Sequence, residues 1–186
     1  MATQKQWMLA GELYSGQDPE SVPDHLHDRS LMDRSNASLA DEDALRLAVL
    51  RELFAAFGEG AVVRPPFQCD YGSNIRIGRG TFVNYGCVML DCNTITIGED
   101  VQIGPAVQIY TPDHPLDAET RRSGLESARP VAIGDNVWLD GGAIVCPGVT
   151  IGADTVVGAG SVVVRDLPPG VVAVGCPCRV LRSLRG

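Results

Sequence analysis

Aliphatic residues recur at every sixth position in the C-terminal half of this chain, and that period constrains the fold more than any other feature. The series runs Ile133, Leu139, Val145, Ile151, Val157, Val163. Helices repeat every 3.6 residues and strands every two, so neither element sustains it. A period of six predicts a coil with short flat faces, in which one aliphatic residue per face points inward and stacks on its equivalent one coil later. Small residues between them suit tight corners.

The same period appears in two upstream series, which are Ile97, Ile103, Ile109 and Ile77, Val83, Met89. The register slips by two residues before Ile97. We therefore predict a mainly β protein, a hexapeptide solenoid that runs from about residue 61 to residue 175. Residues 179–186 would form a short basic tail.

Residues 1–60 follow a different pattern and predict a small helical cap. The segment "DEDALRLAVLRELFAAFG" (41–58) places Leu45, Val49, Leu53 and Phe57 at helical spacing. Acidic residues open it, which suits a helix dipole, and Gly58 is the expected C-cap. A second helix is expected within residues 19–36. The predicted organisation is thus a helical cap over residues 1–60 and a solenoid with its tail over residues 61–186.

Residues 111–130 contain no hexad, so they are expected to leave the coil as an excursion loop. At its root stands "YTPDHPLD" (110–117), where His114 lies between Pro112 and Pro115. The two prolines restrict the backbone on both sides of the ring. A neutral imidazole is a suitable general base for a hydroxyl, although a lone loop histidine is more often surface decoration. Asp113 or Glu126 could orient it.

Composition excludes several functions. The net charge of −8 argues against nucleic-acid binding, and Lys5 is the only lysine, so no Walker A loop exists. No apolar leader and no long apolar run are present, which predicts a cytoplasmic protein outside the membrane. The six cysteines lack metal-site spacing and are expected to be small buried side chains without disulfides.

Several motifs together resemble the maltose and galactoside O-acetyltransferases. They are "AGELY" (10–14), "PPFQCDYGSNIRIG" (65–78), "FVNYGCVMLD" (82–91), "IYTPDHPLD" (109–117), "IGDNVWL" (133–139) and "GCPCRVLR" (175–182). The resemblance covers nearly the whole chain. It implies a left-handed parallel β-helix and transfer of an acetyl group from acetyl-CoA, with no metal, to a hydroxyl of a sugar.

The resemblance also implies roles for individual residues. His114 matches the general base. Asn84 matches a residue that lines the acceptor site and steadies the oxyanion, the alternative being a left-handed turn residue. Asp91 lies near the acceptor-binding carboxylate, the alternative being a corner residue that bonds its own backbone. Asp70, where galactoside enzymes carry Ser, falls on the same acceptor side.

The resemblance places coenzyme A against later coils and C-terminal basic residues. The matching positions are Gly141, Ala159, Val164, Arg165, Arg179 and Arg182. Arginine suits the phosphates, although these residues could simply solvate a tail. Trp138 could flank the pantetheine arm or pack on a neighbouring subunit. Relatives form trimers with sites between subunits, so a homotrimer is expected.

The chain departs from the family pattern at Gly16, Asp70 and Cys92 on the acceptor side, which leaves the acceptor open. Asp140 replaces the usual Gly on the coenzyme side. A non-sugar acceptor and a non-catalytic solenoid remain alternatives. A carbonic anhydrase on this fold would need three histidine ligands, and His114 is the only one outside the cap.

Overall fold

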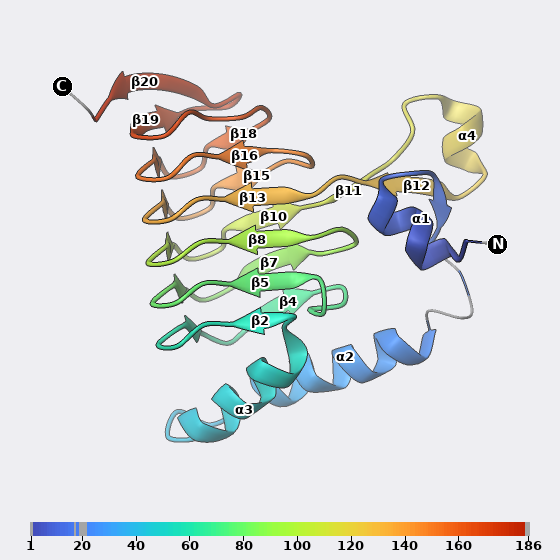
Figure 1. Ribbon diagram of the computed structural model, residues 1–186, viewed down its shortest axis with the longest axis horizontal. Helices are drawn as coiled ribbons and strands as arrows, with labels where there is room; N and C mark the ends of the chain where they lie inside the picture. Colours follow the sequence, from blue (N-terminus) through green and yellow to red (C-terminus); the bar gives the residue numbers. More distant parts are fainter. Residues whose placement is uncertain (1, 17, 19–21, 185–186) are drawn as a thin grey trace.

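The computed structural model describes residues 2–16, 18 and 22–184, and most of them wind into a three-sided parallel coil (Figure 1). Face 1 contains β2 (Ala56–Phe57), β5 (Ile75–Ile77), β8 (Ile95–Ile97), β13 (Val131–Ile133) and β16 (Thr150–Ile151). Face 2 contains β3 (Val62–Val63), β6 (Phe82–Val83), β9 (Gln102–Ile103), β14 (Trp138–Leu139), β17 (Val156–Val157) and β19 (Val171–Val174). Face 3 contains β4 (Phe67–Cys69), β7 (Cys87–Leu90), β10 (Gln108–Tyr110), β15 (Ile144–Val145) and β18 (Val162–Val163).

The predicted aliphatic ladder forms the core of this coil. On face 1, Ile77 pairs with Ile97, which pairs with Ile133, which pairs with Ile151. The other two faces repeat this stacking with the remaining members of each series. Every residue of the three predicted series is at most 2% exposed. The period of six therefore identified the buried rungs correctly.

Three edges separate the faces, and their lengths differ. We call the turns from face 1 to face 2 the third edge (58–61, 78–81, 98–101, 134–137, 152–155) and those from face 2 to face 3 the Asn84 edge (64–66, 84–86, 104–107, 140–143, 158–161). The excursion edge joins face 3 to face 1 (70–74, 91–94, 111–130, 146–149, 164–166). The predicted two-residue slip falls on the excursion edge, between Met89 and Ile97. An equal slip lies one coil earlier, between Cys69 and Ile77.

Helices cover the first coil, although the boundary differs from the prediction. The N-terminal elements are α1 (Gln4–Ala10), β1 (Tyr14–Ser15), α2 (Val22–Asn36) and α3 (Asp43–Leu53). The C-cap of α3 is Phe54, not Gly58, and β2 already pairs with β5. Gly58 instead donates its N–H to the Ile77 carbonyl, and a side chain there would collide with the backbone of the next coil. The solenoid thus begins at Ala56, before the predicted residue 61.

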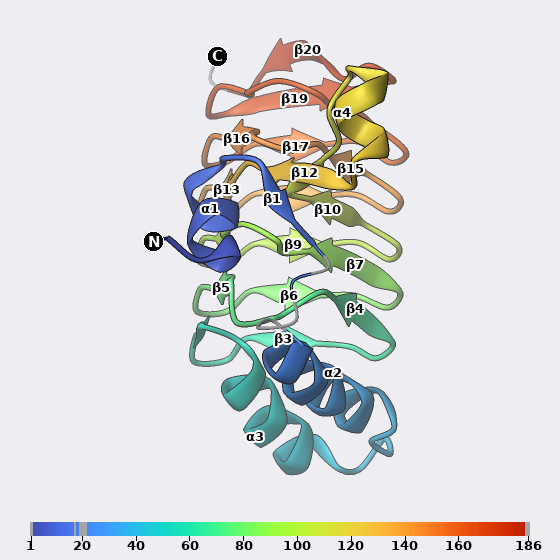
Figure 2. The same cartoon turned by 90° about the vertical axis from the view of Figure 1, so that its right-hand side faces the viewer.

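The excursion of residues 111–130 is more ordered than the predicted loop. It contains β11 (Pro112–Asp113), α4 (Ala118–Arg122) and β12 (Leu125–Ala128). Strand β12 is the middle strand of a small antiparallel sheet, between β11 and β1. Figure 2 shows β1 beside β12. The N-terminal segment therefore clamps the excursion, and this contact between distant parts of the chain leaves no trace in the hexad pattern.

The C-terminal segment is not a free tail. Strand β20 (Arg179–Ser183) runs antiparallel to β19 at the end of the coil, while residues 185–186 lie outside the described part. The prediction of buried cysteines needs a similar correction, because Cys176 is exposed although Cys87 and Cys178 are buried. Within the described residues, no helix has the length and apolar character needed to cross a membrane.

Candidate active site

A cavity of about 300 Å³ lies on the excursion edge, between the excursion and the N-terminal segment. Its walls come from four separate stretches of the chain. They are formed by Tyr14, Gly16, His25, Asp70, Tyr71, Leu90, Cys92, Pro112, His114 and Glu126. The structure thus brings together two of the predicted residues, His114 and Asp70, with side chains from the cap.

His114 follows β11 directly, and its backbone is held from both sides. The Arg121 guanidinium donates hydrogen bonds to the carbonyls of Pro115 and Leu116, at 2.9 and 3.1 Å. Asp117 caps α4 by accepting the N–H and hydroxyl of Thr120, and these bonds lower the pKa of its carboxyl. The ring itself is exposed at the cavity and has no hydrogen bond to any described residue. An incoming hydroxyl could therefore reach it.

The two candidates for orienting His114 differ in their contacts. Asp113 forms an ion pair with Arg129 at 3.2 Å, so its carboxylate is engaged away from the ring. Glu126 lines the cavity together with His114. Pairing of β11 with β12 matches Asp113 to Ser127, and one more residue in that register sets His114 opposite Glu126.

Asp70 has partners that the sequence did not suggest. The Cys92 thiol donates to its Oδ2 at 3.3 Å. His25, from α2, packs against the ring of Tyr71, with centroids 4.0 Å apart and the rings tilted by 37°. Burial raises the pKa of Asp70, and the thiol bond and His25 partly offset that rise. The Asp70 carboxylate therefore already accepts one hydrogen bond from a side chain of the protein, at Oδ2.

Asp91 lies beneath the cavity wall and is fully buried. Its Oδ1 accepts the backbone N–H groups of Asp70 and Tyr71, at 3.1 and 2.9 Å, and its Oδ2 accepts that of Asn74 at 3.2 Å. Burial raises the pKa of Asp91 to about 6, against the lowering effect of these bonds. Asp91 is therefore a corner carboxylate, but it bonds the backbone of the preceding coil and not its own, and it does not line the cavity.

Asn84 stands on a different edge from His114, and the cavity does not include it. Its side-chain oxygen accepts the N–H of Tyr85 at 2.8 Å, and its φ is not left-handed. Gly141 and Ala159 share this Asn84 edge. The Gly141 N–H is bonded to the Asp140 carboxylate at 2.7 Å. Within one chain, face 3 therefore separates these three residues from His114.

The remaining predicted cofactor residues are exposed near the C-terminal end of the coil. Val164 and Arg165 follow β18 on the excursion edge, whereas Arg179 and Arg182 lie on β20. Trp138 is 48% exposed on β14. None of them lines the cavity that contains His114.

Comparison with known proteins adds to this geometry. The maltose acetyltransferase hexapeptide capping motif matches residues 8–58, and the bacterial transferase hexapeptide (six repeats) matches residues 130–165. Nodulation protein L of Rhizobium meliloti (strain 1021) is 54% identical over 178 residues, which are 96% of this chain and 97% of that protein. The chain belongs to the maltose and galactoside O-acetyltransferase family.

Solved structures of this family agree with the fold. A maltose O-acetyltransferase from Clostridium difficile 630 is 46% identical with a TM-score of 0.98, over 100% of this chain and 99% of that one. A galactoside acetyltransferase in complex with coenzyme A is 39% identical with a TM-score of 0.96, over 100% and 92%. The coil is therefore the family's left-handed parallel β-helix. The chain is an acetyl-CoA-dependent acetyltransferase of the galactoside and maltose type.

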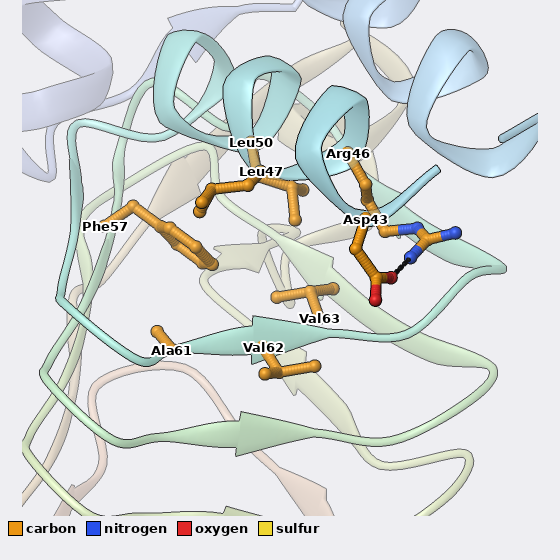
Figure 3. A pocket seen from close by; sticks show the side chains of 8 residues that line it. All are labelled: Asp43, Arg46, Leu47, Leu50, Phe57, Ala61, Val62 and Val63. Carbon is orange, nitrogen blue, oxygen red and sulfur yellow. Dashed lines mark hydrogen bonds and ion pairs between the residues drawn. The ribbon is translucent and has the colours of Figure 1, made fainter. Parts of the chain in front are cut away.

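A second cavity, between α3 and the first coil, differs in chemistry (Figure 3). Leu47, Leu50, Phe57 and the valines of β3 line it, and the Asp43–Arg46 ion pair stands at one end. It contains neither a histidine nor a thiol. This cavity therefore has no imidazole that could deprotonate a hydroxyl.

Sequence reasoning placed Gly16 of the cap on the acceptor side, where it lines the cavity that contains His114, but it missed two other side chains of the cap. Tyr14 and His25 belong to segments predicted only as parts of a helical cap, yet both line the wall beside Asp70. Local patterns carry no signal for this, because the contact depends on how β1 and α2 fold back over the excursion edge. Among the described residues, no cluster of three or more His, Cys, Asp or Glu could hold a metal ion.

Proposed function

We propose that this acetyltransferase acetylates a hydroxyl of a sugar, such as glucose, maltose or a galactoside, with His114 as general base. His114 would take the hydroxyl proton while the oxygen attacks the thioester carbon of acetyl-CoA. Collapse of the tetrahedral intermediate forms the acetyl ester and releases coenzyme A, whose sulfur takes the proton. The exposed, uncommitted imidazole beside Asp70 carries the proposal.

Three further residues have proposed roles on the acceptor side. Asp70 would accept a hydrogen bond from an acceptor hydroxyl, because its carboxylate lines the cavity. Asp91 would act indirectly by holding the backbone of residues 70–74. The Asn84 amide would donate to the oxyanion, which requires that it turn away from Tyr85.

The distribution of these residues supports a homotrimer. Asn84, Gly141 and Ala159 lie on one edge, and His114 with Arg165 lies on another. A complete site forms if the Asn84 edge of one subunit meets the excursion edge of the next. The outward side chains of face 2, which leads into the Asn84 edge, suit such contact, since Val62 and Trp138 are 44% and 48% exposed. A monomer in light scattering at micromolar concentration would contradict this arrangement.

Coenzyme A would lie along the later coils. Backbone groups at Gly141, Ala159 and Val164 would bind the pantetheine arm, and Arg165, Arg179 and Arg182 the phosphates. Trp138 would flank the arm or pack on the neighbouring subunit. A cytoplasmic location remains a prediction from the sequence.

The test is release of free thiol from acetyl-CoA in the presence of glucose, maltose or methyl β-galactoside. We expect release that depends on the acceptor, and a loss of turnover of about 10²–10⁴-fold in His114→Ala while coenzyme A still binds in calorimetry. His27→Ala is the matched control, because His27 is an exposed histidine of α2 outside the cavity.

Two results would contradict the proposal. Equal turnover in His114→Ala and the parent would remove the role of His114. Absence of thiol release with every acceptor would contradict a sugar as the substrate. Loss of coenzyme A binding as well would favour a non-catalytic solenoid.

A further inference from the structure

Two carboxylates, Asp70 and Glu126, line the cavity beside His114, and they differ in the interactions that they make with other residues. Asp70 accepts the Cys92 thiol and lies close to His25. Glu126 has no hydrogen bond and no ion pair with any residue that the structure describes. A carboxylate with both oxygens open can accept two hydroxyl hydrogens at once.

Strand pairing fixes where the Glu126 side chain stands. In the sheet of β1, β12 and β11, Glu126 pairs with Tyr14 on one side and lies next to the Ser127–Asp113 pair on the other. Burial is the main cause of the raised pKa of Tyr14 and of Cys92, and the Glu126 charge raises both further. The Glu126 carboxylate therefore lies close to both side chains. Glu126 therefore stands between β1 and His114 in the wall of the cavity.

Gly16 supplies the room for that carboxylate. A Cβ built on Gly16 would overlap Oε1 of Glu126 and lie 3.3 Å from its Cδ. The backbone of Gly16 does not have a left-handed φ, so conformation alone does not require a glycine. Positions 16 and 126 thus compete for one volume of the cavity, and in this chain Glu126 fills it.

One neighbouring group indicates that this volume receives a polar ligand. The Tyr14 side chain is 3% exposed and lines the cavity, yet its hydroxyl makes no hydrogen bond of acceptable geometry within the described residues; the Cys92 thiol lies close to it but already donates to Asp70. A buried hydroxyl without a partner is unfavourable, and a hydroxylated ligand would satisfy it.

We propose that Glu126 determines acceptor specificity by accepting hydrogen bonds from acceptor hydroxyls, in the space that Gly16 leaves open. The inference rests on the proposed sugar acetylation. It gives Glu126 a binding role towards the acceptor and does not make it the residue that orients His114.

The experiment moves the carboxylate from one side of the shared space to the other. Glu126→Ala is expected to raise KM for the best of glucose, maltose and methyl β-galactoside about 10–100-fold, as for loss of a charged hydrogen bond, with KM for acetyl-CoA unchanged. Gly16→Asp alone also weakens acceptor binding, because its carboxylate meets that of Glu126. Gly16→Asp combined with Glu126→Ala is expected to lower the acceptor KM about ten-fold or more relative to Glu126→Ala alone.

Further measurements separate the possible roles of Glu126. Glu126→Gln, which keeps the shape, should raise KM only a few-fold and controls for misfolding, together with thermal unfolding of each variant. The pH profile of kcat should not move in Glu126→Ala.

Three outcomes would overturn the inference. They are an unchanged acceptor KM in Glu126→Ala, a fall in kcat with a displaced pH profile, and a double variant no better than Glu126→Ala. If the parent chain acetylates none of the three sugars, the proposed function falls first and this inference with it.

Discussion

The excursion edge and the third edge of the same coil differ in how regular their turn lengths are. At the third edge every turn has the same length, so the rungs on either side stay six residues apart. At the excursion edge the turn is two residues longer in the first two coils, and twenty residues leave the coil in the next. His114, Asp70 and Asp91 all lie on this irregular edge. A solenoid thus keeps two edges regular for folding and modifies one for chemistry.

The contacts that hold the two edges also differ. Left-handed backbone closes the third edge, at Gly60, Gly80, Asp100, Asn136 and Asp154. At the excursion edge Gly72 and Gly148 are left-handed too, and buried polar side chains add further contacts. Besides Asp91, Asn93 accomplishes this by donating to the carbonyls of Met8 and Ala128, at 3.1 and 3.0 Å. Side chains at the third edge, such as Thr81 with the Gly98 carbonyl, bond the next coil, whereas Asn93 at the excursion edge reaches the N-terminal cap.

The largest predicted effect is a difference in stability between a truncation in the ladder and the same truncation on the excursion. Leu139→Ala removes a rung that is 0% exposed, and we expect about 2–5 kcal/mol lower free energy of unfolding, because a cavity remains in the core. Leu116→Ala makes the same truncation at a side chain that is 95% exposed on the excursion, and should change stability by less than about 0.5 kcal/mol. Urea unfolding at one protein concentration measures both. Similar losses in the two variants would mean that the excursion is as integrated as the ladder.

A smaller effect should arise from the buried carboxylate of the excursion edge. The pKa of Asp91 is about 6 in the folded protein and 3.8 as its ordinary value. Folded protein therefore binds this proton more tightly, so the contribution of Asp91 to stability is highest below pH 4 and falls as pH rises through 6. Asp91→Asn removes this titration, but it also loses an acceptor for backbone N–H groups.

The measurement is the difference in free energy of unfolding between the parent and Asp91→Asn. It should grow in favour of the parent by about 2 kcal/mol as pH falls from 7 to 4. Glu119→Gln is the control, because Glu119 is exposed on the excursion and its carboxylate makes no hydrogen bond with any described residue. A difference independent of pH would show that Asp91 is not the group that titrates.

Sequence predicted the ladder well and the edges unevenly, for physical reasons. A rung such as Ile151 repeats an environment shared by every coil, so its period identifies it. His114 could be found because it interrupts that period. Gly58 was misassigned because a glycine after a helical pattern has the composition of a C-cap, while its actual contact is with a coil twenty residues further on.

Residues that meet through folding back were beyond the reach of any period. Tyr14 and Glu126 become neighbours because β1 pairs with β12, a contact between segments more than a hundred residues apart. The family resemblance placed Asp91 near the acceptor site, and it gives no information on whether this corner carboxylate points outward or inward. Burial and three backbone N–H donors distinguish the two cases.

The smallest effect concerns the Asn84 edge, whose turns use the same backbone as the third edge. Ala106 has a φ of 57° there, in the left-handed region that disfavours a Cβ, and Gly86 occupies the equivalent corner one coil earlier with a φ of 72°. Ala106→Gly should raise the free energy of unfolding by about 0.5–1 kcal/mol, since relief of the left-handed conformation exceeds the added freedom of the unfolded chain. Gly86→Ala is the reverse change with room for the Cβ, whose nearest neighbour lies at 3.9 Å, so it should destabilise by about 1 kcal/mol. Equal and opposite shifts in thermal unfolding would attribute the regular edges to backbone conformation, whereas shifts of the same sign would attribute them to contacts of the side chain.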